Sequence, residues 1–280
     1  MAAEILDVKS FVRNWKKEMR SSVQRSVEAG KRKPSLTIVQ VGDNPASTKY
    51  VDNKIKDCKE VGVMVELYRI PEGAGLDQEA LNGIVYDAET DGILVQLPLP
   101  QGLNAETALG YTVLGADVDG FMPGSPHNPA TARGIIEYLE SLGLEDGSGK
   151  NALVIGRSKI VGRPVAKMLL DRNWTVTVAH SKTRDLHEQL LGKQLIVCAV
   201  GQATFLNLEM VPAGCVVVDV GCNFITTPDG AKMVGDCYNH ESDKAMCKVT
   251  PVPGGVGLLT RAALIGNLID AWESGDGNNI

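Results

Sequence analysis

Residues 154–164 read Val-Ile-Gly-Arg-Ser-Lys-Ile-Val-Gly-Arg-Pro, and this stretch decides the fold class of its half of the chain. A buried strand ends at a glycine, a short loop follows, and a helix begins near the proline. In parallel α/β sheets this geometry presents free backbone N–H groups to a phosphate. The spacing is neither Gly-x-Gly-x-x-Gly nor a Walker A loop, so the stretch alone also fits a strand-to-helix turn without a ligand.

The end of the next strand indicates which dinucleotide would bind. A site for NAD usually carries Asp or Glu there, for the ribose 2′-hydroxyl. Here Ala179 is followed by His-Ser-Lys-Thr-Arg, which offers hydroxyl groups and positive charge but no carboxylate. Arg157 and Ser181 therefore favour a 2′-phosphate and hence NADP, although a solvated turn with ordinary surface charge has the same composition.

Alternating strands and helices predict an α/β protein with two parallel sheets. We expect strands at 35–41, 63–70, 92–97, 151–155, 175–179, 195–200 and 215–220. We expect helices at 8–29, 45–60, 77–89, 132–142, 163–172, 185–191 and 258–272. The polar stretch 117–131, rich in glycine and proline, is the predicted linker between two domains.

Composition and charge exclude several classes of protein. The composition is 44% hydrophobic and 22% charged, which is ordinary globular usage. The length of 280 residues suggests about two domains or one large one. A net charge of −6 gives no overall basic field for nucleic acid or for an anionic membrane. Neither a membrane-spanning run nor a signal peptide is visible, so we expect a cytoplasmic protein. The six cysteines form no Cys-x-x-Cys pair, so we expect reduced thiols and no metal site.

Polar residues of the first half point to a second site. Tyr50 and Lys54 lie four residues apart and so share one face of the predicted helix 45–60. A lysine at the edge of a core can be partly desolvated, and it can then move a proton or polarise a substrate. On these two residues alone, a packed tyrosine beside a solvent-exposed lysine is the simpler interpretation. Gln96 ends a central parallel strand, where open α/β sheets bind ligands. Asp119 lies in the predicted linker, where a carboxylate can bind an amino-heterocycle or cap a turn.

The ordered set of segments resembles one family, the bifunctional 5,10-methylenetetrahydrofolate dehydrogenase/5,10-methenyltetrahydrofolate cyclohydrolases of the FolD type. The segments that carry the resemblance are 41–47 with Tyr50 and Lys54, 96–100, 117–121, 156–164, 180–183 and 251–257. The resemblance covers nearly the whole chain. It implies an N-terminal βα parallel-sheet folate domain formed by residues 1–120 plus 258–280. It also implies a Rossmann-type NADP-binding domain at 121–257, with the C-terminal helix packing back on the first domain.

The resemblance also implies the function. Members oxidise 5,10-methylenetetrahydrofolate with NADP and hydrolyse the methenyl product to 10-formyltetrahydrofolate, in one-carbon metabolism and purine biosynthesis. They are usually homodimers, so the implied partners are tetrahydrofolate derivatives and a second copy of the chain, without nucleic acid or membrane. The implied catalytic residues are Lys54, Tyr50, Gln96 and Asp119. The implied folate site adds Val95, Leu97, Pro253, Gly254, Gly255, Val256 and Gly257. The implied cofactor site consists of Gly156, Arg157, Ser158, Val161, Gly162, Ser181 and Cys222.

The sequence departs from the family pattern in the linker and at one cofactor position. The loop Met122–His127 is shorter than is usual, and Ala130 and Ala132 stand where the family has cysteine and a second proline. Cys222 replaces a larger aliphatic residue. These departures leave open a dehydrogenase without cyclohydrolase activity, or an inactive folate-binding relative. A dehydrogenase acting on a small polyol or keto acid is a further alternative, against which the set of polar residues around Lys54 argues.

Overall fold

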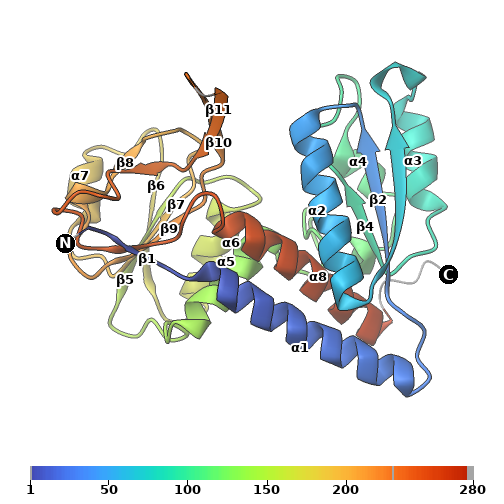
Figure 1. Cartoon of the computed structure of the whole chain (residues 1–280), viewed down its shortest axis with the longest axis horizontal. Helices are drawn as coiled ribbons and strands as arrows, with labels where there is room; N and C mark the ends of the chain where they lie inside the picture. The colour runs from blue at the N-terminus through green and yellow to red at the C-terminus, as the bar shows by residue number, and fades with distance from the viewer. Residues whose placement is uncertain (1, 229, 276–280) are drawn as a thin grey trace. The chain divides into compact units, whose positions relative to one another are not determined.

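The computed structural model describes residues 2–228 and 230–275, and the chain forms two compact units (Figure 1). Unit 1 comprises Met1–Arg13 and Thr131–Thr260, and unit 2 comprises Asn14–Ala130 and Arg261–Ile280. The last residues of the predicted segment 258–280, from 276 on, lie outside the described residues. Within the described ranges no helix is long and apolar enough to cross a bilayer.

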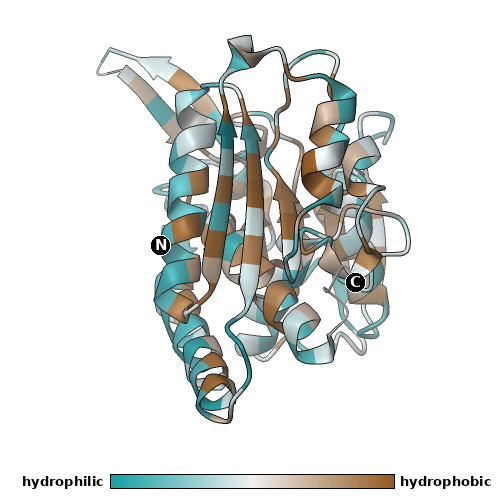
Figure 2. Ribbon diagram, turned by 90° about the vertical axis from the view of Figure 1, so that its right-hand side faces the viewer, coloured by the Kyte–Doolittle hydropathy of each residue, from teal (hydrophilic) through white to brown (hydrophobic). Residues whose placement is uncertain are grey.

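Unit 2 is built on a three-stranded parallel sheet, which confirms the predicted β-α-β-α-β order. The strand order is β3-β2-β4, and Ile38 of the central strand faces Leu67 on one side and Leu94 on the other. Figure 2 shows the apolar colouring of β2 and β4, whose residues are almost all buried, whereas β3 is half exposed. The strands are β2 (Ser35–Val41), β3 (Met64–Ile70) and β4 (Gly92–Val95), and the helices α2 (Pro45–Val61), α3 (Gln78–Tyr86) and α4 (Ala105–Leu109).

Two long helices contribute residues to both units, α1 (Val8–Glu28) and α8 (Val256–Ser274). From Arg261 onward α8 belongs to unit 2, which confirms that the C-terminal helix packs back on the first domain. Asn267, only 1% exposed, donates from Nδ2 to the carbonyl oxygens of Val118 and Asn128, at 2.7 and 3.0 Å. Trp272 is fully enclosed in the same unit.

Unit 1 contains a six-stranded parallel sheet in the order β1-β13-β9-β7-β5-β6. Its strands are β1 (Glu4–Ile5), β5 (Asn151–Ile155), β6 (Thr175–Ala179), β7 (Leu195–Cys198), β9 (Val216–Asp219) and β13 (Lys248–Val249). The helices are α5 (Ala130–Ser141), α6 (Gly162–Leu170) and α7 (Leu186–Leu190). Two strand pairs were not predicted: β8 (Leu206–Asn207) with β12 (Cys237–Tyr238), and the hairpin β10 (Asn223–Thr227) with β11 (Gly230–Val234).

The unit boundaries differ from the predicted domains 1–120 plus 258–280 and 121–257. The first 13 residues belong with the six-stranded sheet, because Glu4 and Ile5 pair with Lys248 and Val249. Phe11 packs edge-on against Tyr138, with 5.3 Å between the ring centroids. The division in the predicted linker falls after Ala130, since the backbone N–H of Ala130 still donates to Asp119, at 3.1 Å.

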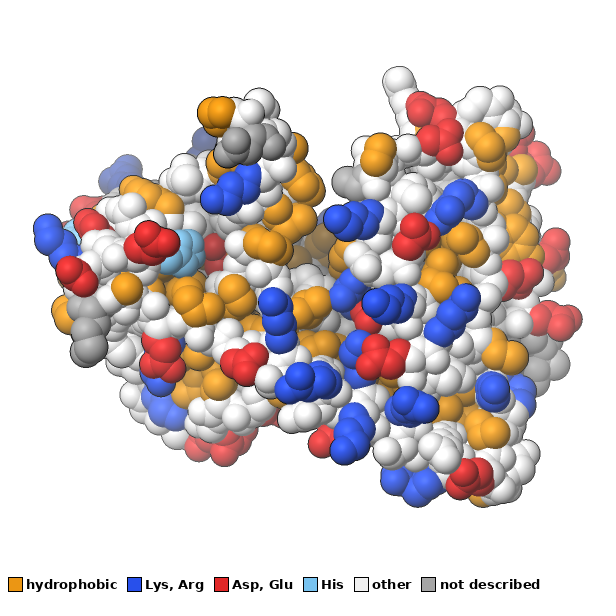
Figure 3. All heavy atoms as spheres, in the orientation of Figure 1, with side chains coloured by type: hydrophobic (Ala, Val, Ile, Leu, Met, Phe, Trp, Pro, Cys, Tyr) orange, Lys and Arg blue, Asp and Glu red, His pale blue; other side chains and the backbone are white. Residues whose placement is uncertain are grey.

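Charged side chains on unit 2 pair with one another. Figure 3 shows lysines and arginines interspersed with carboxylates over α1 and α2 on the face in view. Lys16 of α1 contacts Asp57 at 2.9 Å and Glu60 at 2.5 Å, both on α2. Because Asp57 also lies 3.0 Å from Nε of Arg261, its carboxylate joins three helices of this unit.

Candidate active site

Helix α2 presents Tyr50 and Lys54 on its inner face. Its start follows the predicted signals, since Asn44 accepts the N–H of Ser47 at 3.1 Å and Pro45 is the first helical residue. Lys54 is only 4% exposed, which contradicts the simpler interpretation of a solvent-exposed lysine. Its Nζ lies 4.8 Å from the centroid of the Tyr50 ring, a cation–π contact between residues one helical turn apart.

The carboxyl end of β4 brings Gln96 to the same amine, although β4 is an edge strand of the three-stranded sheet and not the predicted central strand. The backbone N–H of Gln96 continues the sheet by donating to Val39, at 2.9 Å. Lys54 Nζ donates to Gln96 Oε1 at 3.2 Å, and Gln96 Nε2 donates to the carbonyl of Leu97 at 2.7 Å. The second bond fixes which end of the amide faces the lysine. Val95 is buried at the end of this strand, and Leu97 is exposed beside it.

Asp119 reaches this region along a segment that runs beside β4. Asp117 forms an isolated parallel bridge with Ile93, so the segment follows the strand toward its carboxyl end. Asp119 is 8% exposed and interacts electrostatically with Lys54. All four predicted catalytic side chains thus meet in unit 2, three of them around one buried amine. Their individual roles stay predictions.

Burial sets the electrostatics of the site. It lowers the pKa of Lys54 below its ordinary 10.5 and Arg261 lowers it further, whereas Asp119 opposes this. Burial raises the pKa of Asp119 above 3.8, with Asp117 adding to the rise and Lys54 opposing it. Burial also raises the pKa of the Cys58 thiol to about 12, which keeps this neighbour neutral. A desolvated amine of this kind can exchange its proton more readily than a surface lysine.

The shortened loop is folded onto the same segment. Asp117, fully buried, accepts the backbone N–H of Met122 through Oδ2 at 2.7 Å. Ser125 donates from Oγ to the Asp117 carbonyl at 3.3 Å. His127 Nε2 lies 2.8 Å from the carbonyl oxygen of Gly115, which can only accept, so Nε2 carries the proton. The loop Met122–His127 is therefore held by hydrogen bonds to Asp117 and Gly115 rather than to the carboxylate of Asp119.

The raised pKa of Asp119 predicts a pH dependence of stability. A carboxyl that binds its proton more tightly when folded stabilises the fold below about pH 3.8, and this contribution is lost as the pH rises through the folded pKa. Asp119→Asn removes the titration. As the pH rises from about 3.8 through the folded pKa of Asp119, the wild type should therefore lose unfolding free energy relative to the variant. Urea unfolding at a series of pH values measures it, and a difference independent of pH would contradict the assignment.

In unit 1, the stretch 154–164 forms the predicted strand, loop and helix. Gly156 has φ +117° and lies against the carbonyl of Ala199, where a Cβ would collide, so only glycine fits the close approach of these two loops. Ser158 accepts the N–H groups of Val161 and Gly162 through Oγ, at 3.2 and 3.3 Å, and the helix α6 begins at Gly162. Arg157 and Ser158 are exposed on the loop.

The remaining predicted cofactor residues lie at the carboxyl ends of β6 and β9. After β6, Thr183 Oγ1 accepts the N–H of His180 at 2.9 Å, which leaves Ser181 exposed at the tip of a turn. Cys222 is exposed just after β9. In the sheet order these strands flank β5 and β7, so their ends share one edge. The predicted folate-site residues 253–257 belong to unit 1, whereas Lys54 belongs to unit 2. A folate site that contains both therefore stays a prediction.

Two buried carboxylates at this edge were not predicted from the sequence. Asp219 and Asp236 are both fully buried and accept hydrogen bonds from backbone N–H groups of the surrounding loops. The available signals were an aspartate that ends the apolar strand 216–219 and the Gly-Asp pair at 235–236.

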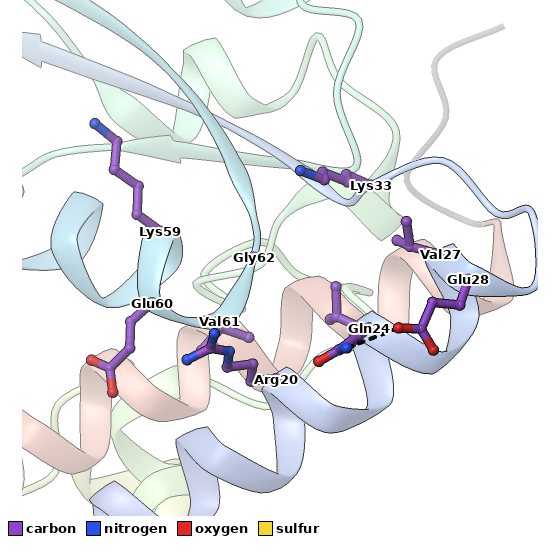
Figure 4. A pocket seen from close by; sticks show the side chains of 10 residues that line it. Arg20, Gln24, Val27, Glu28, Lys33, Lys59, Glu60, Val61 and Gly62 are labelled. Carbon is purple, nitrogen blue, oxygen red and sulfur yellow. Dashed lines mark hydrogen bonds between the residues drawn. The ribbon is translucent and has the colours of Figure 1, made fainter.

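A separate groove in unit 2, with a volume of about 340 Å³, lies between α1 and the turn that follows α2 (Figure 4). Val23 and Val61 are buried beneath it, and its charged side chains are all exposed. Glu28 is held by Gln24 at 2.8 Å and Glu60 by Lys16. The groove therefore lacks the buried polar groups that mark the Lys54 site. It is lined by Arg20, Val23, Gln24, Val27, Glu28, Lys33, Lys59, Glu60, Val61 and Gly62.

All six cysteines are free thiols, and five of them are buried. Among residues 2–228 and 230–275 no group of three or more His, Cys, Asp or Glu side chains is arranged to hold a metal ion.

Comparison with known families matches both parts of the chain. Residues 6–119 match the description "Tetrahydrofolate dehydrogenase/cyclohydrolase, catalytic domain". Residues 129–275 match "Tetrahydrofolate dehydrogenase/cyclohydrolase, NAD(P)-binding domain". The second match confirms the predicted nicotinamide dinucleotide cofactor and the dinucleotide-binding fold. It includes all of α8, although Arg261 and the residues after it pack in unit 2.

Individual relatives agree over nearly the full length. The bifunctional protein FolD of Moorella thermoacetica is 38% identical over 282 residues, which cover 97% of this chain and 99% of that protein. The crystal structure of the bifunctional FolD enzyme of Campylobacter jejuni has a TM-score of 0.88 at 36% identity and covers 98% of this chain and 100% of that one. The Trypanosoma brucei enzyme, solved with NADP cofactor and an inhibitor, also has a TM-score of 0.88, at 30% identity, and covers 98% and 99%. The chain belongs to the tetrahydrofolate dehydrogenase/cyclohydrolase family.

Proposed function

We propose that this protein oxidises 5,10-methylenetetrahydrofolate to 5,10-methenyltetrahydrofolate with NADP and hydrolyses that product to 10-formyltetrahydrofolate. The observation that carries the proposal is the arrangement around Lys54 in a chain of this family. Its buried amine donates to Gln96, lies over the Tyr50 ring and interacts with Asp119. Nothing in the folded loop Met122–His127 disturbs these contacts, so no observation favours the alternative without cyclohydrolase activity.

The carboxyl edge of the six-stranded sheet fits NADP. A loop with exposed Arg157 and Ser158 precedes α6, and the turn after β6 offers exposed Ser181 and no carboxylate at residues 180–184. These three side chains would hold the cofactor, with Cys222 on the nicotinamide side. NADP, when bound, supplies the acceptor for the hydride that leaves the methylene carbon. The contribution of the protein to this step is alignment of the two reactants.

Hydrolysis needs proton movement, and we assign this to Lys54. The oxygen of a water molecule adds to the methenyl carbon, and one ring carbon–nitrogen bond breaks. Of the two protons that the water loses, one goes to the released nitrogen and the other to solvent. Gln96 holds Nζ of Lys54 at 3.2 Å, while burial keeps the pKa of this amine below that of a surface lysine. A positioned group that can both give and take a proton is what this step requires. Asp119 would hold the amino-heterocycle of the folate.

We further propose a homodimer. Among the described residues the hairpin β10–β11 pairs with no other strand, and its Phe224 is 58% exposed. An open strand edge beside an exposed aromatic ring is a surface that a second copy can cover. Sedimentation of the purified protein distinguishes the dimer from a monomer. The cytoplasmic location, the role in purine biosynthesis and the absence of nucleic-acid and membrane partners stay predictions.

One assay tests the proposed reactions. Purified protein is mixed with 5,10-methylenetetrahydrofolate and NADP, and the absorbance of NADPH and of the methenyl product are followed in the same trace. We expect NADPH to form with little accumulation of the methenyl compound, because hydrolysis consumes it. Accumulation without hydrolysis would leave a dehydrogenase only, and no NADPH would refute the proposal.

A further inference from the structure

Asp236 lies fully buried between the hairpin β10–β11 and β12, and it accepts four hydrogen bonds. Its Oδ2 accepts the backbone N–H groups of Val200 and Gly201, at 2.8 and 2.9 Å. Its Oδ1 accepts the N–H of Gln202 and Nδ2 of Asn223, both at 2.9 Å. A buried carboxylate needs such donors at both oxygens, because desolvation would otherwise make its charge prohibitively costly.

The donors to Asp236 come from the loop after β7 and from the start of β10, at the cofactor edge of the sheet. Val200, Gly201 and Gln202 follow β7, and Asn223 follows β9, directly after Cys222. The loop after β7 also touches the dinucleotide loop, since the carbonyl of Ala199 lies against Gly156. One carboxylate therefore connects the neighbourhood of Gly156 with that of Cys222.

A second carboxylate fixes Asp236 itself. Asp219, at the end of β9, accepts the backbone N–H groups of Gly221, Asp236 and Cys237, each at 2.9 Å. A side chain at position 235 would collide with the Asp219 carboxylate, so Gly235 is required by this close approach. The N–H of Asp219 in turn donates to Thr250 at 2.9 Å. Asp219 thus fixes the backbone of Asp236, and the side chain of Asp236 in turn binds the two segments.

We propose that Asp236 is a positioning residue for the dehydrogenase reaction, whose carboxylate sets the loops 199–202 and 221–223 in the arrangement that the nicotinamide end of the cofactor requires. This inference rests on the proposed NADP-dependent reaction. Three of its four donors lie in the loop after β7 and the fourth is the first residue of β10, so none of them lies in the six-stranded sheet. Loss of these four hydrogen bonds should displace the segments 199–202 and 221–223 but leave the six-stranded sheet folded.

Asp236→Asn tests the proposal, because an amide keeps the size of the side chain but has a single acceptor oxygen. Its NH2 group must then face either Val200 and Gly201 or Gln202 and Asn223, all of which are donors. We expect the KM for NADP to rise by about tenfold, the effect of losing one charge-assisted hydrogen bond. The hydrolysis of methenyltetrahydrofolate, measured without NADP, should stay unchanged, since Lys54 and its partners lie in unit 2.

Two further variants keep the test decisive. Asn223→Ala removes one donor and leaves Asp236 its three backbone donors, so the KM for NADP should rise less, in the same direction. This variant decides the matter if Asp236→Asn does not fold. Asp146→Asn is the matched control, because this exposed carboxylate also accepts several hydrogen bonds, from Ser148 and Asn173, but before the amino end of β5.

An unchanged KM for NADP in the folded variants overturns the proposal. So does a parallel fall of both activities in Asp236→Asn, which would mean a purely structural role. A wild-type protein that does not reduce NADP refutes the proposed function instead, so the two failures are distinguishable.

Discussion

Lys54→Met is expected to lower the hydrolysis of methenyltetrahydrofolate by about 10²–10⁴-fold, the usual contribution of a positioned acid–base group. Methionine has a similar length and suits a buried position, but it cannot donate to Gln96 or carry a proton. Hydride transfer needs alignment of two bound reactants rather than a protein base, so NADP reduction should remain measurable. Single-turnover rates of the two reactions in the purified variant measure this split.

The control is Lys56→Met, which makes the same substitution at an exposed position of α2 and should leave both rates as in the wild type. Circular dichroism establishes that both variants are folded. Undiminished hydrolysis by folded Lys54→Met would remove this residue from the mechanism, and with it the principal catalytic assignment.

Arg157→Ala is expected to weaken the binding of NADP far more than that of NAD. The guanidinium is exposed at the start of the loop before α6, and residues 180–184 offer no carboxylate for a ribose 2′-hydroxyl. A charge-assisted contact to a phosphate contributes roughly 1.5–3 kcal/mol, or about 10–150-fold in affinity. Titration of the variant with each dinucleotide measures the two dissociation constants separately.

Ser181→Ala should change the same ratio in the same direction by less, because a neutral hydroxyl contributes less than a guanidinium. Lys167→Ala serves as the control, since it removes a positive charge from the outer face of α6, where Lys167 pairs with Asp171. If the wild type binds NAD as tightly as NADP, or if Arg157→Ala weakens both equally, the assignment of the 2′-phosphate site is wrong.

The sequence predicts the elements that are long and periodic. The strands β5 and β6 have the predicted bounds, because short apolar or β-branched runs between turn residues specify a strand locally. The strands β1 and β13 have two residues each and carry no periodic pattern. They exist because two segments more than 240 positions apart in the chain complete each other's backbone hydrogen bonds.

Some contacts of the candidate site follow from local sequence patterns, and others depend on segments that are distant in the chain. The pairing of Tyr50 with Lys54 follows from helical spacing, and the approach of Gln96 from the rule that ligands bind at strand ends. The near-complete burial of Lys54 does not follow from spacing, because it depends on other elements packing against α2. Gln96 and Asp119, which interact with its amine, both come from outside this helix. The Gly-Asp pair at 235–236 does not reveal the contacts of Asp236, since its backbone donors lie 34 to 36 residues earlier, in one loop without periodicity.

The sharing of both chain ends between the two units has a consequence for folding during synthesis. The strand β1 is synthesised more than 240 residues before its partner β13. Unit 2 likewise receives Leu268 and Trp272, two of its buried side chains, only with the final helix. Unit 1 cannot complete its sheet before β13 has emerged, nor unit 2 its core before α8 has emerged, and contacts of such long range form slowly. The nascent protein therefore exposes two unfinished apolar surfaces, which are protected from aggregation only after β13 and α8 have been made.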